Sequence, residues 1–169
     1  MYKEHKKVFF LYSLIVLLAV SSPCFAERAE EELYGGISQY CGTIKQTLTA
    51  ISHDDSRMRA ELGAYYEKIA NNYIIPLNAR FVKSNQPNVG LLELQKQFAE
   101  EREEFNESYI EYARGMEVLI AVDCKKEPEK FYGQLTKLRE ARAVVNQESR
   151  EMEEIIEKFY YAVEELYEK

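Results

Sequence analysis

Residues 131–166 read FYGQLTKLREARAVVNQESREMEEIIEKFYYAVEEL. Apolar residues recur there in steps of three and four, with Arg142 and Ser149 as polar interruptions. Because an α-helix turns once in about 3.6 residues, this spacing places the apolar side chains on one side of a long helix. Such a stripe needs partner helices of similar length to exclude water. Its apolar members are Phe131, Leu135, Leu138, Val145, Met152, Ile156, Phe159, Val163 and Leu166.

A second stripe with the same spacing begins at Ile37, and only Asp55 breaks its apolar character. Ser52 and Asp55 resemble a capping box, which is a helix-start signal. The stretch therefore fits either one long helix or two helices joined by a reversal. The three- and four-residue spacing continues unchanged through residues 52–55, which favours one helix, because a reversal of the chain would not be expected to preserve it. The apolar members are Ile37, Cys41, Ile44, Leu48, Ile51, Met58, Leu62, Tyr65 and Ile69.

Proline and turn residues mark the ends of the remaining segments. Pro76 lies inside the apolar pattern, so we expect a kink between residues 71 and 75. Residues 84–88 have turn chemistry, and Asn88 is a suitable N-cap for a further helix that runs to about Cys124. Pro128 fits the first position of the last helix.

Together the stripes predict an all-α fold. The expected architecture is an elongated, antiparallel three-helix bundle that resembles a coiled coil. The alternative is a four-helix up-and-down bundle, which requires the chain to reverse near Ser52–Asp55.

The first 26 residues have the organisation of a secretory signal peptide. Lysines precede an uninterrupted apolar run at residues 8–20, and the small residues Cys24 and Ala26 fit a cleavage site. The run is short for a permanent span, which needs about 20 apolar residues. We therefore expect export to the periplasm or the extracellular space, with a membrane tether through an uncleaved signal anchor as the alternative. Beyond residues 1–26, we expect a flexible lead-in at residues 27–36 and a helical bundle domain at residues 37–169.

Cys41 and Cys124 remain after cleavage, and an even number of cysteines in an exported protein suggests a disulfide. Its two Cα atoms must lie within about 7 Å of each other. In the four-helix arrangement the cysteines are about 28 Å apart along the bundle axis. In the three-helix arrangement the offset is about 9 Å, which a fraying helix end at Cys124 or the kink at Pro76 can absorb. The three-helix bundle therefore permits the bond and the four-helix bundle excludes it.

Asp55, Arg142 and Ser149 occupy positions of the stripes where an apolar residue is expected. Glu61 is the acidic residue nearest to Arg142 by level along the bundle, and Asp55 is about a turn and a half away. We interpret these residues as polar contacts that set the register of the bundle, in preference to a buried ligand site. On this interpretation, Arg142→Leu leaves the thermal stability unchanged or raises it.

Charge and composition exclude several classes of function. The net charge is −7, and loss of residues 1–26, which carry three lysines and one glutamate, makes it −9. An acidic chain without a basic stripe argues against nucleic acid and anionic lipid as partners. Glu-x-x-His and Cys-x-x-Cys-His motifs are missing from the sequence, which argues against di-iron and haem sites. The glutamates of residues 100–104 and 151–157 are interpreted as solvated faces. We expect no catalytic residue, no cofactor and no metal.

These patterns predict a protein that acts by protein–protein contact, as an exported scaffold, adaptor or accessory subunit in the cell envelope. The alternative is a periplasmic holdase-type chaperone or a carrier of apolar ligands, which requires an exposed apolar groove. No membrane insertion is expected after signal cleavage. The expected partner is another protein, and a homodimer stays open because a heptad seam also recruits a second copy.

Overall fold

A computed structural model describes residues 23–85 and 88–167 of the chain. It confirms the all-α class, because those residues form helices and short connections without a strand. The elements are α2 (Pro23–Gln39), α3 (Cys41–Ile69), the π-helix η1 (Ala70–Ile74), α4 (Ile75–Lys83), α5 (Val89–Ala121) and α6 (Pro128–Tyr167). Among the helices so described, none is both long enough and apolar enough to cross a membrane.

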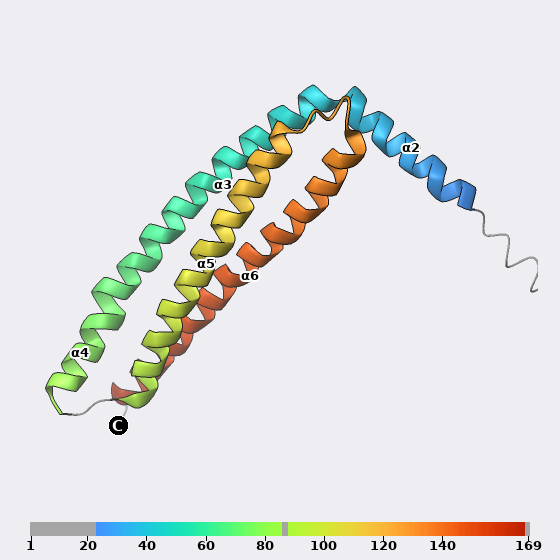
Figure 1. Cartoon of the computed structure of the whole chain (residues 1–169). Coiled ribbons are helices and arrows are strands. Elements are labelled where there is room, and N and C mark those ends of the chain that lie inside the picture. Colours follow the sequence, from blue (N-terminus) through green and yellow to red (C-terminus); the bar gives the residue numbers. More distant parts are fainter. Residues whose placement is uncertain (1–22, 86–87, 168–169) are drawn as a thin grey trace, which may run out of the picture.

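The helices α3, η1 and α4 follow one another without a break and form a first rod (Figure 1). The chain does not reverse near Ser52–Asp55, since these residues lie within α3. The hydroxyl of Ser56 donates to the carbonyl of Ser52 at 2.8 Å, one turn back. Thr47 and Thr49 do the same with Thr43 and Lys45. The hydroxyls are thus satisfied inside the helix and do not cap a new one.

The irregularity expected next to Pro76 is a π-helical turn at Ala70–Ile74. Proline has no N–H to donate, and its ring clashes with the carbonyl of the preceding turn. A wider π turn relieves this clash without ending the helix. Ile74 and Ala70 on this turn are buried, so the bulge lies within the packed part of the rod.

The helices α5 and α6 form the other two rods and lie beside the first (Figure 1). The side chain of Asn88 accepts a hydrogen bond from the backbone N–H of Leu91 at 3.1 Å, which confirms it as the N-cap of α5. Pro128 is the first residue of α6, as expected, with Glu129 in its first turn. The α4–α5 turn and the end of α6 mark the "hairpin end" of the molecule. The 122–127 loop and the start of α3 mark its "disulfide end".

Residues 27–36, expected to be a flexible lead-in, belong to helix α2, which projects away from the three rods (Figure 1). Gly35 and Gly36 do not break this helix, because neither has a positive φ. The last turn of α2 is held by contacts of Tyr34 with Tyr132 and by burial of Ile37. The signal-peptide interpretation concerns mainly residues 1–22, which lie outside the described residues.

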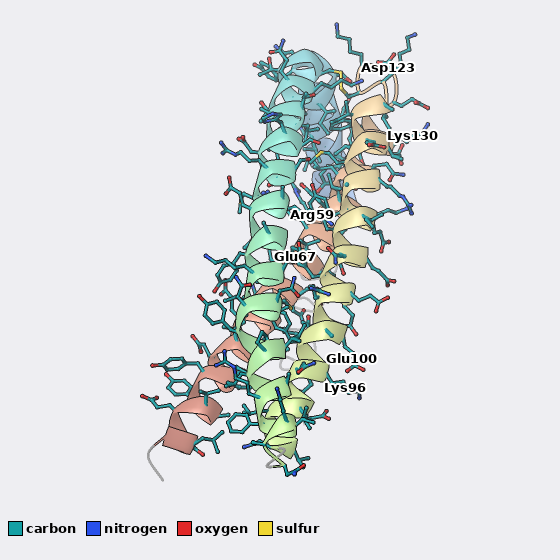
Figure 2. All side chains as sticks on the ribbon, turned by 90° about the vertical axis from the view of Figure 1, so that its left-hand side faces the viewer. Arg59, Glu67, Lys96, Glu100, Asp123 and Lys130 are labelled. Carbon is teal, nitrogen blue, oxygen red and sulfur yellow. A yellow bond between two sulfur atoms is a disulfide. The ribbon has the colours of Figure 1, made fainter. Side chains whose placement is uncertain are left out.

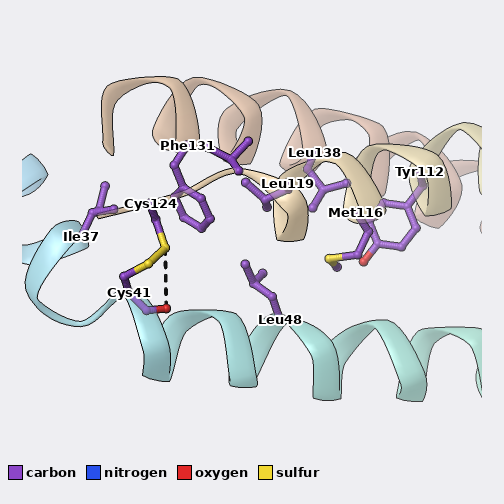
Figure 3. Packing of buried hydrophobic residues seen from close by; sticks show 10 residues of the cluster. Ile37, Cys41, Leu48, Tyr112, Met116, Leu119, Cys124, Phe131 and Leu138 are labelled. Carbon is purple, nitrogen blue, oxygen red and sulfur yellow. Dashed lines mark hydrogen bonds between the residues drawn. A yellow bond between two sulfur atoms is a disulfide. The ribbon is translucent and has the colours of Figure 1, made fainter. Parts of the chain in front are cut away.

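The core is divided into two hydrophobic clusters along the rods. The cluster at the disulfide end is shown in Figure 3 and includes Ile37, Cys41, Leu48, Met116, Leu119, Cys124, Phe131 and Leu138. The cluster at the hairpin end includes Tyr66, Ile74, Leu91, Phe98, Phe105, Met152, Ile155 and Phe159. Val145 packs against both. Between them lies a "polar layer", built around the sequence positions that interrupt the stripes.

Candidate functional site

A disulfide joins Cys41 and Cys124, with the two Cα atoms 5.5 Å apart, which confirms the predicted pair (Figure 3). The axial offset expected from helix geometry disappears because α5 ends at Ala121 and Val122 is extended. Cys124 therefore belongs to the loop, where its side chain is fully buried. The bond fixes the start of the first rod to the connection between the other two.

The polar layer contains the predicted residues Asp55 and Arg142 in direct contact. Arg142 Nη2 donates to Asp55 Oδ1 at 2.8 Å, and the Tyr112 hydroxyl donates to the other oxygen of this carboxylate. The Asp55 side chain is 13 % exposed and that of Arg142 is 49 % exposed. Burial of the ring and the hydrogen bond to Asp55 raise the pKa of the Tyr112 hydroxyl. Glu61, expected to be nearest to Arg142, instead points into solvent.

Ser149 lies at the edge of this layer that faces the hairpin end, and it contacts Tyr66 across the bundle. The two hydroxyls are 3.0 Å apart, and the Tyr66 hydroxyl also lies 3.3 Å from the Ser149 carbonyl. Burial raises the pKa of the Tyr66 hydroxyl. Between these contacts, Arg59 donates to the side-chain carbonyl of Asn106 at 3.0 Å, and its guanidinium lies 5.5 Å from the centre of the Tyr109 ring. The layer therefore links all three rods by side-chain contacts.

An apolar groove separates the first rod from α6, with α5 as its floor over much of its length. Three hollows follow one another along it, and each has residues of the first rod on one side and of α6 on the other. Their volumes are about 360 Å³ towards the disulfide end, about 120 Å³ at the polar layer and about 370 Å³ at the hairpin end. Figure 2 shows α6 passing behind α3 and emerging beyond it at the hairpin end. We call this feature "the groove".

The two walls of the groove are formed by the predicted stripes. Partner helices do not cover the whole of these stripes. Met58 is 55 % exposed, and Tyr65 is exposed as well. Sequence periodicity identifies the side of a helix that is apolar, but it does not show whether another helix covers it. The wall residues include Ile44, Leu48, Ile51, Leu62, Ile69 and Leu77 on the first rod, and Leu135, Leu138, Val145, Ile156, Phe159 and Val163 on α6.

Sequence reasoning missed a cluster of three carboxyl groups. One oxygen each of Glu101, Glu148 and Glu151 lies within 4.8 Å of the others, where α5 meets α6. Glu101 and Glu151, interpreted from the sequence as parts of solvated faces, are thus partly buried here, and Glu148 joins them. Burial, followed by the hydrogen bond and the charge of Glu148, raises the pKa of Glu101 to about 8. A proton on Glu101 is thus sufficient to hold two of the carboxyl groups together at pH 7.

The remaining ionisable groups do not form an obvious reaction centre in the described part of the chain. His53 is largely exposed and lies 3.8 Å from Asp54, its neighbour in sequence. Comparisons with protein families, with curated proteins and with solved structures returned no match for this chain. The candidate site with the clearest physical character is therefore the groove, an apolar surface of considerable length crossed by one polar layer.

Proposed function

We propose that this chain is an elongated, antiparallel three-helix bundle that is exported and acts by protein–protein contact, as an adaptor or accessory subunit of the cell envelope. The observation that carries the proposal is the groove, whose apolar walls extend from Thr43 to Arg80 on the first rod. At 1.5 Å per residue this is about 56 Å of helix. An apolar surface of that length on a folded protein is typical of an interaction site.

The rest of the molecule supports a role as a stiff holder of such a surface. The disulfide ties the first rod to the other two at one end. In the middle, Asp55, Arg142 and Tyr112 join the three rods. At the hairpin end, the Asn78 side chain donates to the Leu91 carbonyl at 3.0 Å and to the Gln95 side chain at 2.8 Å. With both ends and the middle held, the two walls of the groove are kept at a fixed separation.

Export is supported by the signal-peptide pattern and by the disulfide. Disulfides persist in oxidising compartments, which include the periplasm and the extracellular space. We therefore place the protein in one of these compartments, either free or tethered by an uncleaved signal anchor. Glu27 as the first residue of the purified protein, read by N-terminal sequencing, supports the free form.

In vivo photo-crosslinking tests the contact function. Tyr73→p-benzoylphenylalanine places the reactive group in the hollow at the hairpin end, and the full chain is expressed in the cells from which it comes. We expect one discrete crosslinked species that contains a second protein, identified by mass spectrometry. Crosslinks spread evenly over abundant envelope proteins, or none at all, argue against the proposal. A crosslink to a second copy would instead assign the surface to a homodimer.

A carrier of apolar ligands is the second candidate, and the hollow at the hairpin end favours it. This hollow of about 370 Å³ is lined mainly by apolar side chains, including Ile69, Leu77, Ile156, Phe159 and Val163. Native mass spectrometry of the freshly purified protein separates the two functions. A stoichiometric lipid or fatty acid supports the carrier, whereas a ligand-free mass with weak fluorescence of the dye ANS supports the contact protein.

A further inference from the structure

The geometry points to a specific occupant of the groove: one amphipathic helix of another protein, with acidic residues along the edges of its apolar face. This inference rests on the proposed contact function and adds the chemistry of the partner.

The shape is that of a helix bundle with one position open. The first rod and α6 both pack on α5, and the groove between them runs along the rods. Its walls are single stripes of side chains with helical spacing, such as Leu48, Ile51, Met58 and Leu62. A fourth helix laid between two such walls would insert its own apolar residues in the manner of coiled-coil packing. No element within residues 23–85 and 88–167 occupies this position.

The charges beside the groove are mostly positive, although the chain as a whole has a net charge of −7. Among the residues that the structure describes, Arg59, Arg80, Arg139 and Arg142 line the hollows, and Asp55 is the only acidic residue that does so. Asp55 is already paired with Arg142. Arg80 and Arg139 are exposed and form no ion pair with other described residues. They are therefore available for carboxylates of a partner, at opposite ends of the groove.

The same charges disfavour the groove of a second copy as the occupant. Two grooves placed face to face would bring Arg80 and Arg139 of each copy near arginines of the other, and like charges across an interface are unfavourable. A basic amphipathic helix is disfavoured for the same local reason. An acidic helix instead combines burial of its apolar face with new ion pairs at both ends.

The spacing of the hollows fits a helix better than a lipid. On the first rod the hollows centre near Leu48, Arg59 and Tyr73, which are about 17 and 21 Å apart along a helix. Anchoring residues on a partner helix recur at such intervals every three or four turns. A single acyl chain is long enough for one hollow, and the polar layer would interrupt its contact with the next. Binding of a fatty acid in place of a helix is accordingly one outcome of the test.

Two synthetic peptides of about 28 residues provide the probes, because four heptads cover about 42 Å of the groove. Both carry leucine at the a and d positions, and they differ only in having glutamate or lysine at e and g. Like charges at these positions keep each peptide monomeric. Because the protein is acidic overall, its long-range field favours the lysine peptide. We expect the glutamate peptide to bind at least tenfold more tightly in fluorescence anisotropy, and equal or reversed affinities would overturn the inference.

Paired charge variants locate the binding. R80E/R139E should weaken binding of the glutamate peptide at least tenfold. R114E/R150E changes the net charge equally at two exposed arginines that do not line the three hollows, and it should change the affinity less than twofold. Similar losses in both variants would show a general charge effect and contradict the inference. Displacement of the glutamate peptide by oleate at one equivalent would show that the hairpin-end hollow prefers a lipid.

Neighbouring tyrosines separate failure of this inference from failure of the proposed function. Tyr160 and Tyr161 are 62 % and 61 % exposed, but only Tyr160 lines the groove. With p-benzoylphenylalanine in the full chain in its native cells, Tyr160→p-benzoylphenylalanine should crosslink to a helical, acidic segment of the partner, and the same change at Tyr161 should not. A specific partner captured only from Tyr161 would retain the contact function and reject the groove. A specific partner captured from neither position, nor from Tyr73, would reject both.

Discussion

The rods are joined to one another by different interactions at the two ends of the molecule. At the disulfide end the rods are joined covalently, and the last turn of α2 adds Ile37 and Tyr34 to the cluster. At the hairpin end the rods are joined by side-chain hydrogen bonds from Asn78, and the first rod contains a π turn. There a hollow of about 370 Å³ stays open between Tyr73 and Tyr160, and a hollow of about 360 Å³ stays open in the groove towards the disulfide end. The comparison teaches that a covalent bond and a set of side-chain hydrogen bonds can each hold the rods together beside an incompletely covered apolar face.

Removal of the disulfide should cause the largest loss of stability, and it should affect the disulfide end more than the hairpin end. The bond spans 83 residues of sequence, so the chain-entropy model assigns it about 4 kcal/mol of the free energy of unfolding. We expect C41S/C124S to lose about this amount in urea denaturation. Hydrogen exchange should accelerate most at the start of α3 and in the 122–127 loop, and less near Tyr66.

Reductant provides the control for this experiment. Dithiothreitol should lower the stability of the wild-type protein towards that of C41S/C124S and leave the variant unchanged. Equal acceleration of hydrogen exchange at both ends would show that the two clusters unfold as one unit, and the contrast between them would then have no energetic basis.

Arg142→Leu tests how much the polar layer between the two hydrophobic clusters contributes to stability. The sequence argument expected no loss of stability, but the structure shows that Arg142 neutralises the largely buried carboxylate of Asp55. We now expect a loss of about 1 kcal/mol, since Arg142 itself is half exposed and its ion pair is partly screened by water. Thermal unfolding checks this, with Arg139→Leu as the control one turn earlier in α6. A variant at least as stable as the wild type would restore the original interpretation.

Tyr66→Phe is a smaller change on the hairpin side of the polar layer. It removes the hydroxyl that meets Ser149 and retains the buried ring between Phe98 and Phe105. Loss of one such hydrogen bond should lower the free energy of unfolding by about 1 kcal/mol. Tyr65→Phe alters the exposed neighbour and should change it by less than about 0.5 kcal/mol. Equal effects of the two substitutions in urea denaturation would show that the Tyr66–Ser149 contact adds nothing.

Glu101→Gln should have an effect that grows as the pH rises from about 4.5 and is largest at high pH. Because the pKa of Glu101 is raised to about 8 in the folded protein, its contribution to stability is fully present below its ordinary pKa near 4.5 and is lost as the pH rises through 8. The variant lacks this titration, so we expect its melting temperature to exceed that of the wild type by a few degrees at pH 9 and to match it near pH 5. Glu103→Gln, at an exposed position, should not alter the pH profile. The same profile for both variants and the wild type would contradict the assignment.

The helical elements and the disulfide could be predicted from the sequence alone. The phase of the apolar residues through Asp55 predicted the unbroken α3, and the Asn88 and Pro128 signals marked two helix starts. These features depend on local spacing and on backbone chemistry, which a sequence displays directly.

Features that depend on how the rods lie beside one another could not be predicted from the sequence. Helix rise places Glu61 nearest to Arg142 by level along the axis, whereas the partner that Arg142 contacts, Asp55, depends on how α6 crosses α3. The approach of Glu101 to Glu148 and the exposure of Met58 have the same origin. Helix α2 was missed because two adjacent glycines usually indicate a break, although neither needs a left-handed backbone here.

The π turn at Ala70–Ile74 carries a consequence for how this chain tolerates insertion and deletion. Such a turn holds one residue more than an α-helical turn of the same span, and each residue advances a helix by about 100°. Deleting one residue between positions 70 and 74, together with replacement of Pro76, would let the rod become α-helical throughout while keeping every later side chain on its present face. The same deletion in the middle of α3 would rotate Asn78 away from Leu91. The first rod thus contains a site at which one residue can be deleted without rotating the contacts that follow, provided that Pro76 is replaced as well.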